Sequence, residues 1–293
     1  MPSPRVQLLA VVVLVVSPVG VPAQTPSPAP APLTAEQRTA EIRKMNWLEG
    51  KQPLTRSKST LALPDGFGMV RDAEARRMDM LINGVGDDEL EAIVSGNKGT
   101  VYFSYVDAGY VTDDDWSNVD ASGMIDDIKS GTEEANAERE SQGLGRMHVT
   151  GWLQQPVFDK PTKTVHWAIE GTADDGAWVN AIALKLGRYG YERITWATAP
   201  EDYRPTGGTT DVMLAAQNFD SGARYEDHVS ADKLAGYGIG ALVATVAGVK
   251  IAQVLGFGAI LLFAKKFIVL IIAGVAAAFG AVRRFFGGSR KQS

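Results

Sequence analysis

A hydrophobic stretch near the C-terminal end constrains this chain more than any other feature. Residues 234–286 carry only Lys250, Lys265 and Lys266 as charges before the Arg283-Arg284 pair. A water-soluble domain rarely exposes an apolar run of this length, so a membrane is expected to take it up. We therefore predict a hydrophobic membrane region at 231–286, with membrane lipid as one partner of the chain.

The three lysines divide this region into apolar segments at 235–249, 251–264 and 267–282. A straight transmembrane helix needs about 20 apolar residues, and flanking Lys and Arg side chains can extend a shorter segment by reaching the interface. The last segment is basic on both sides, so it is the best candidate for a transmembrane helix. Its membrane residues begin with the run Phe267, Ile268, Val269, Leu270, Ile271 and Ile272.

Charge predicts the orientation of that helix. The final residues, including the tail 287–293, are basic, and basic segments stay on the cytoplasmic side. One crossing then places the preceding domain in the periplasm, with the protein in the inner membrane. A hairpin of two crossings is the alternative, and the number of crossings stays open.

The N-terminal end reads as a targeting segment. Residues 1–23 hold Arg5, an apolar run at 6–16 and a Val21-Pro22-Ala23 sequence typical of a signal-peptidase site. We expect a cleaved signal peptide, and an uncleaved N-terminal anchor is the alternative. Prolines recur through 24–34, which indicates an extended linker.

The polar middle, 35–230, alternates between helical and strand patterns. Helices are predicted at 35–48, 70–81, 122–142 and 210–217, and strands at 59–63, 92–95, 100–106, 147–153, 164–170, 178–186 and 191–198. The connections between the last four strands are too short for parallel crossovers. The prediction is an α+β domain with a largely antiparallel meander and several packed helices.

Several short motifs of this domain resemble the uncharacterised, membrane-anchored bacterial family called domain of unknown function 2167. They are Gly109-Tyr110-Val111 before the three aspartates 113–115, the segment 131–136 with Arg139, Gly151-Trp152 with Pro156 and Asp159, His166-Trp167-Ala168, and later Phe219, Gly222, Arg224-Tyr225 and Tyr237-Gly238. The likeness covers most of 61–284, with His228 standing where an aromatic residue is expected. The resemblance implies a fold and a membrane location but no activity.

The acidic run Asp113-Asp114-Asp115 is the first candidate for chemistry. Carboxylate oxygens can bind Ca²⁺, and they could serve a membrane-tethered hydrolase, but the run lacks the alternating spacing of an EF-hand loop. Solvated loop residues and helix caps are the structural alternative. His148 and His166 are the second candidate, as a zinc-binding or acid–base pair.

Other signals of chemistry are missing from the sequence. The chain has no cysteine, no nucleophile elbow, no phosphate loop and no dinucleotide fingerprint, and its net charge of −5 excludes a strongly basic nucleic-acid binder. We predict no cofactor and a non-enzymatic module that binds a protein or another component of the envelope. Self-association through the Gly-rich tail is a further hypothesis, because Gly236, Gly240, Ala244 and Gly248 lie four residues apart.

Overall fold

The computed structural model describes residues 33–83, 86–141, 145–174 and 176–247. Three predicted regions lie outside the described residues: the signal peptide at 1–23, most of the linker at 24–34, and the transmembrane segment at 267–282. Among the described helices, none is both long and apolar enough to cross a membrane.

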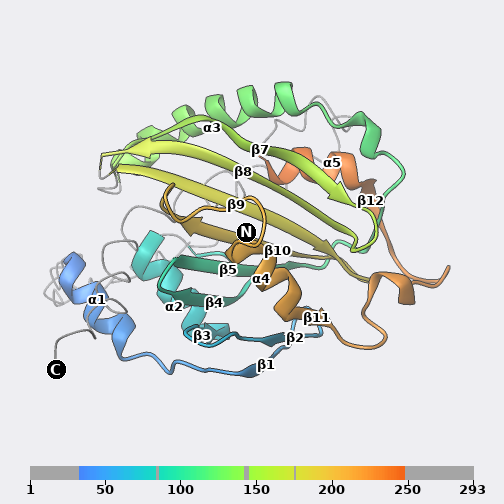
Figure 1. The fold of residues 1–293 in the computed structure, drawn as a ribbon, viewed down its shortest axis with the longest axis horizontal. Coiled ribbons are helices and arrows are strands. Elements are labelled where there is room, and N and C mark those ends of the chain that lie inside the picture. Colours follow the sequence, from blue (N-terminus) through green and yellow to red (C-terminus); the bar gives the residue numbers. More distant parts are fainter. Residues whose placement is uncertain (1–32, 84–85, 142–144, 175, 248–293) are drawn as a thin grey trace, which may run out of the picture. The chain divides into compact units, whose positions relative to one another are not determined.

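A seven-stranded antiparallel sheet forms the centre of the domain (Figure 1). Its order is β3-β4-β5-β10-β9-β8-β7, with the strands β3 (Gly68–Arg71), β4 (Leu90–Gly96), β5 (Gly99–Val106), β7 (Met147–Asp159), β8 (Thr164–Ala173), β9 (Gly176–Leu186) and β10 (Tyr191–Thr198). The predicted meander is confirmed in β7 to β10, and the predicted hairpin is confirmed in β4 and β5. Gly99 closes that hairpin at a φ of +118°, where an added Cβ would lie 2.3 Å from the Ala197 carbonyl oxygen.

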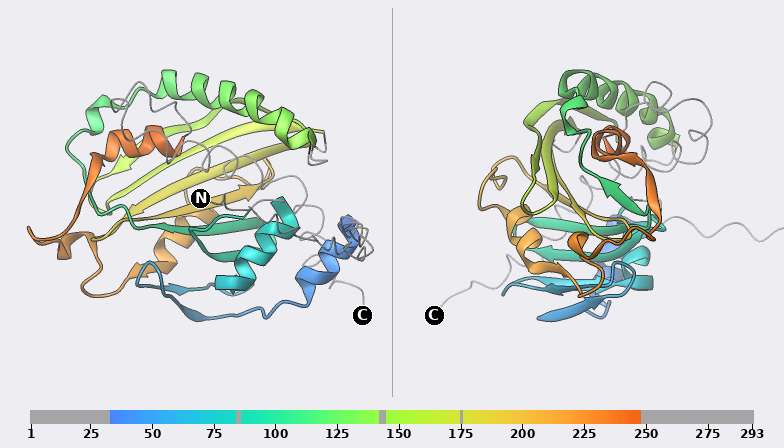
Figure 2. Two further views of the ribbon diagram at one scale, coloured as in Figure 1. Left: turned by 180° about the vertical axis from the view of Figure 1, so that it is seen from behind. Right: turned by 90° about the vertical axis from the view of Figure 1, so that its right-hand side faces the viewer.

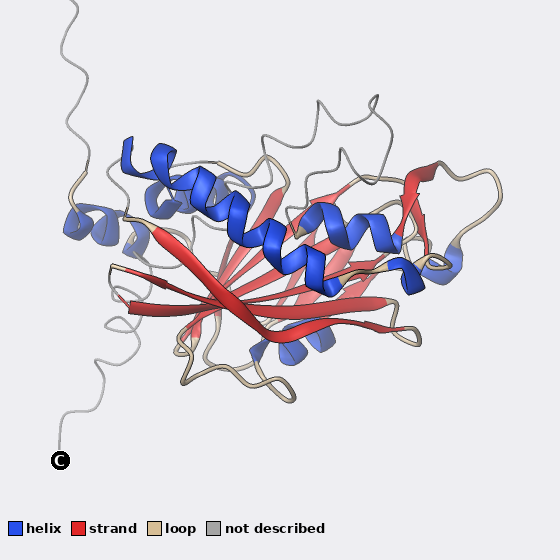
Figure 3. Cartoon of the chain, turned by 90° about the horizontal axis from the view of Figure 1, so that it is seen from above, coloured by secondary structure: helices blue, strands red, loops and turns tan. Residues whose placement is uncertain are grey.

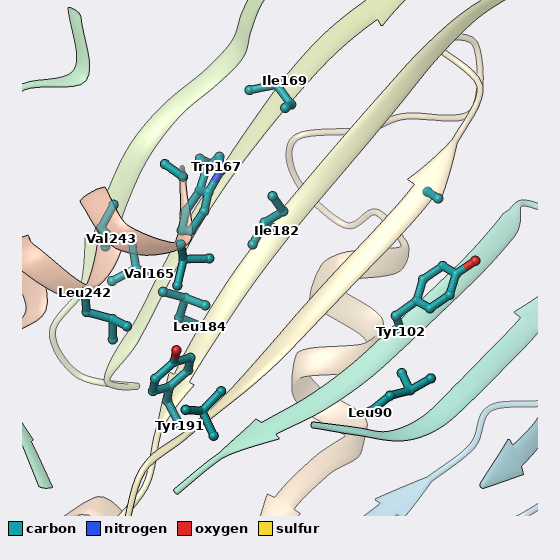
Figure 4. Close-up of a cluster of buried hydrophobic side chains, with 14 of the residues drawn as sticks. Leu90, Tyr102, Val165, Trp167, Ile169, Ile182, Leu184, Tyr191, Leu242 and Val243 are labelled. Atoms are coloured by element: carbon teal, nitrogen blue, oxygen red, sulfur yellow. The ribbon is translucent and has the colours of Figure 1, made fainter. Parts of the chain in front are cut away.

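One face of this sheet is covered by helices (Figures 2 and 3). They are α2 (Asp72–Asn83), α3 (Ala121–Ser141) and α5 (Ile239–Val246). Trp167, Ile182 and Leu184 point from the strands toward Leu242 and Val243 of α5 (Figure 4). The alternation predicted for residues 164–170 is confirmed, because Trp167 and its neighbours two positions away face this core.

The opposite face packs against a three-stranded sheet and a helix. The small sheet has the order β1-β2-β11, from Lys51–Leu54, Ser59–Ala62 and Gln217–Phe219, and the helix is α4 (Thr209–Ala216). Leu54, Leu61 and Met213 pack there on Phe103, Ile194 and Trp196. The tryptophans of the meander are therefore divided between the two faces, with Trp167 and Trp178 on one and Trp196 on the other.

The N-terminal helix is shorter than predicted. Helix α1 spans Ala35–Arg43 and has the predicted capping box of Thr34 and Gln37. It ends before Leu48, because the Leu48 N–H and C=O groups both bond to Met69 of β3 at 2.8 Å. The helix predicted from residue 70 likewise begins at Asp72, since β3 takes Val70 and Arg71 and Asp72 turns the chain with a φ of +56°.

The hydrophobic region does not begin as a membrane segment. Residues 234–238 form β12, which pairs in parallel with β6 (Tyr110–Thr112). The following helix, α5, buries Ile239, Leu242, Val243 and Val246 completely against the sheet. Residues 234–247 therefore belong to the folded domain. The predicted membrane region can begin only after them, later than its predicted start at residue 231.

Candidate functional site

The aspartates 113–115 follow β6 and precede the short 3₁₀ helix η1 (Trp116–Asn118). Asp113 pairs with Lys163 of the β7–β8 turn, with 2.6 Å between Oδ2 and Nζ. Asp115 accepts a hydrogen bond from the Gly240 backbone N–H at 3.0 Å, and Asp114 is exposed. Two of the three predicted carboxylates are thus joined to distant parts of the chain.

Asp115 lies against the first turn of α5. A Cβ added at Gly238 would lie 2.5 Å from the Asp115 carboxyl carbon, and one added at Gly240 would lie 2.9 Å from the Asp115 backbone oxygen. These glycines let the strand–helix turn approach the loop closely. Gly240, one residue of the predicted self-association ridge, is therefore used in a contact within the chain.

Lys163 also connects Asp113 to an aromatic stack. Its ammonium lies 5.0 Å from the centre of the Tyr225 ring, which is a cation–π distance. Tyr110 stacks on Tyr225 with 4.4 Å between ring centres and on His228 with 3.7 Å. The Tyr225 hydroxyl donates to the Val111 backbone oxygen at 2.9 Å, which fixes the stack to β6.

Asp232 closes the arrangement beside His228. Its two carboxylate oxygens accept bonds from Arg188 at 2.8 and 2.9 Å, and the Val229 N–H donates a third bond at 2.8 Å. The His228 Nδ1 atom lies 3.2 Å from Asp232 Oδ2. Hydrogen bonding from Arg188 first, and then from Val229, lowers the pKa of Asp232 to about 2, so the carboxylate is ionised.

We call this set the junction cluster; its members are Tyr110, Asp113, Asp115, Lys163, Arg188, Tyr225, His228 and Asp232. They come from β6 and the loop after it, the β7–β8 turn, the β9–β10 turn and the segment before β12, so they join one end of the sheet to the strand that leads into α5. Each buried or half-buried carboxylate has a cation or a backbone N–H as partner. Such an arrangement fixes segments in place, with Asp113 Oδ2 on Lys163 and both Asp232 oxygens on Arg188.

The two predicted histidines are not brought together. His148 on β7 lies opposite Thr172 of β8, six residues beyond His166, or about 20 Å along the strand. The His148 Nδ1 atom lies 2.5 Å from Glu133 Oε1 of α3, and His166 lies opposite Val157. Within the part of the chain that the structure describes, no three His, Asp or Glu side chains converge as ligands for a metal ion.

Sequence reasoning missed a second set of polar residues, which is buried on and beside the sheet. Asp87 pairs with Arg193 at 2.7 Å and accepts a bond from the Ser104 hydroxyl at 2.8 Å. On the other face, the carboxyl groups of Glu91 and Glu192 are buried close to each other. The alternation of side chains along β10 could have revealed the buried glutamate, because Glu192 shares its face of the strand with the apolar residues Ile194 and Trp196.

Comparison with known proteins places the chain in a family. The family model described as "Protein of unknown function (DUF2167)" matches residues 46–276, so the chain belongs to that family. This confirms the resemblance seen in the sequence motifs. The description names no activity, and membership therefore assigns none.

Other comparisons add little. No curated protein matches the chain. Among solved structures, the chain is similar to the solution structure of cyanobacterial PsbP (CyanoP) from Synechocystis sp. PCC 6803, at 10% identity and a TM-score of 0.35, over 58% of this chain and 91% of that one. At that TM-score the two chains are too different for their functions to be compared.

Proposed function

We propose that this protein is a membrane-anchored periplasmic module that binds an envelope protein and has no catalytic activity. The observation that carries the proposal is the way α5 is built into the domain. Strand β12 and helix α5 end the described chain at Ala247, and the apolar sequence around Phe267–Val282 follows only twenty residues later. The junction cluster then fixes the strand and helix that precede the proposed anchor in the sequence.

The chemistry of the site supports a binding role over hydrolysis. A general base or a metal ligand needs a carboxylate that is free to meet its proton or ion. Asp113 and Asp115 instead hold Lys163 and the first turn of α5. Asp114 is the only one of the three whose side chain is exposed, and a single exposed carboxylate is an ordinary surface feature.

Single-cysteine labelling tests the proposed topology cleanly, because the chain has no cysteine of its own. We would place one cysteine at Ser221, in the exposed turn that precedes Tyr225, and another at Ser293. With a membrane-impermeant maleimide on bacterial cells whose outer membrane has been made permeable, Ser221→Cys should react and Ser293→Cys should react only after lysis. Reaction of both variants before lysis would contradict the single crossing.

The binding role needs a separate test. A photo-crosslinking residue at Ser221 or at exposed Val157 of β7 should give discrete crosslinked species with envelope proteins in living cells. A matched probe at Lys129 of α3 reports how much crosslinking arises by chance. Equal, diffuse crosslinking at all three positions would contradict a specific partner.

A further inference from the structure

The buried glutamates Glu91 and Glu192 lie where the three-stranded sheet meets the seven-stranded sheet. Their side chains are 1% and 0% exposed. Leu90 and Ala92 pair with consecutive residues of β5, so Glu91 is the extra residue of a β-bulge. The bulge turns Glu91 toward the small sheet, on the same side as Ala92.

Glu91 holds the turn between β1 and β2. Its Oε2 atom accepts bonds from the backbone N–H groups of Arg56 at 3.1 Å and of Ser57 at 3.3 Å. The Ser57 hydroxyl in turn lies 2.8 Å from that of Ser59 on β2. These two backbone donors therefore connect the β1–β2 turn to Glu91 of the seven-stranded sheet.

Glu192 is the member of the pair that holds a proton. Burial, and then the neighbouring Glu91 carboxyl, raise the pKa of Glu192 well above its usual value. Within the described residues neither Glu192 oxygen makes a hydrogen bond of regular geometry. Glu91 and Ser57 nevertheless lie close enough to shift the pKa of Glu192. Two adjacent buried carboxyl groups cannot both ionise without strong repulsion.

The other charged groups around Glu192 are engaged elsewhere. Lys185, its neighbour on β9, donates to the Leu214 carbonyl oxygen at 3.0 Å and to that of Gln217, which holds β11 on the sheet. Burial lowers the pKa of Lys185 to about 8, with Glu192 acting in the opposite direction. Arg193 points to the other face and pairs with Asp87.

The remaining titratable neighbours lie on β5 and on the β1–β2 turn. Tyr105 lies opposite Glu192 on β5, and Asp107 beyond it is exposed. On the turn, the Arg56 guanidinium donates to the Asp88 carbonyl oxygen, and the Lys58 ammonium lies 4.4 Å from the centre of the Tyr189 ring. The two cations of the turn thus contact groups other than Glu192.

From this geometry we propose that Glu91 and Glu192 form a proton-dependent latch, which holds the three-stranded sheet on the seven-stranded sheet while Glu192 is protonated and releases it when both carboxyl groups ionise. Loss of the proton sets two buried negative charges against each other. Glu91 relieves the repulsion by leaving the N–H groups of Arg56 and Ser57, and the β1–β2 turn opens.

Hydrogen exchange of the whole chain in detergent micelles tests the latch. Protection factors corrected for the intrinsic effect of pH should fall at least about tenfold for the Arg56 and Ser57 amides between pH 6 and 9, because one unit of pKa shift corresponds to a tenfold change. Amides of central strand β5 serve as the internal reference and should stay protected. Equal protection of the turn at both pH values would overturn the latch.

Two variants separate Glu192 from other groups. Glu192→Gln is neutral at every pH, so it should keep the turn protected at pH 9, whereas the exposed control Glu226→Gln should behave like the wild type. If Glu192→Gln shows the same fall as the wild type, Lys185 or another group drives the opening, and the proposal is wrong.

A wild-type measurement keeps the test independent of variant folding. With ¹³C-labelled glutamate, one side-chain carboxyl resonance of the whole chain should keep the chemical shift of a protonated acid at pH 7. If every glutamate is ionised at that pH, Glu192 holds no proton and there is no latch.

Discussion

The acids of the junction cluster and the acids inside the central sheet are arranged in opposite ways. At the junction, Asp113 and Asp232 each face a cation, and Asp232 stays ionised far into the acid range. In the buried interior, Glu192 of β10 faces another carboxyl group, and Asp79 of helix α2 has its pKa raised to about 6, chiefly by burial. Carboxyl groups thus serve as fixed ties in one region and as proton-binding groups in the other.

The largest effect should come from breaking a charge pair inside the sheet. Arg193→Met leaves Asp87 buried without its cation, and we expect a loss of about 3–5 kcal/mol in the free energy of unfolding. Arg146→Met is the matched control, because Arg146 pairs with exposed Glu140 and surface pairs contribute about 0–1 kcal/mol. Chemical denaturation of the whole chain in detergent measures both, and equal losses would remove the distinction between the two environments.

The two regions should also respond to pH with opposite signs. Because the pKa of Asp79 is raised to about 6, the folded state keeps a proton that the unfolded chain releases above about pH 4, and stability falls by roughly 2–3 kcal/mol as pH rises to 6. Because the pKa of Asp232 is lowered to about 2, its contribution is present above about pH 4 and is lost as pH falls toward 2.

Denaturation midpoints across pH 2 to 7 give both trends. Asp232→Asn should flatten the change below pH 4 and leave the decline toward pH 6 in place. Two results would show that the two sets of acids are not distinct. One is a variant whose stability no longer depends on pH either below pH 4 or from pH 4 to 6, and the other is a wild type whose stability rises steadily to pH 6.

A smaller effect is expected where the junction meets α5. Asp115→Ala removes the acceptor of the Gly240 N–H in the first turn of α5. Loss of a side-chain acceptor at a helix N-terminus typically costs about 1 kcal/mol of stability. Hydrogen exchange should increase in the first turn of α5 and stay unchanged in β8 and β9. A uniform increase across the sheet would mean that Asp115 supports the whole domain instead of this helix.

The smallest effect is predicted for Asp114. Asp114→Asn changes an exposed side chain and should alter stability by less than about 0.5 kcal/mol, whereas Asp113→Asn breaks the ion pair with Lys163 and should cost about 1 kcal/mol. Loss of cellular function in Asp114→Asn at unchanged stability would favour the hydrolase alternative.

Local patterns were enough to predict much of the fold. Alternation identified β8 and its neighbours, and turn residues identified the hairpin closed by Gly99. The strands that were missed, β1, β3, β6, β11 and β12, have three to five residues each and are fixed by partners far away in sequence. A window of sequence contains too little of such a pairing to reveal it.

The candidate site shows the same limit. The run Asp113–Asp115 is conspicuous in sequence, but its partners Lys163 and Gly240 lie 50 and 125 residues away. Hydrophobicity alone also placed Leu242 and Val243 in a membrane, since a helix buried against a sheet and a helix buried in lipid have the same composition. Only the packing of α5 on β8 and β9 distinguishes it from a membrane helix.

The hydrophobic stretch begins inside the domain with α5, and we propose that its later residues enter the bilayer. Photolabelling from the lipid phase, using the whole chain in vesicles and a carbene reagent attached to the lipid tails, tests it most directly. We predict label on residues 267–282 and none on Ile239–Val246. Equal labelling of both segments, or label confined to Ile239–Val246, would contradict the account.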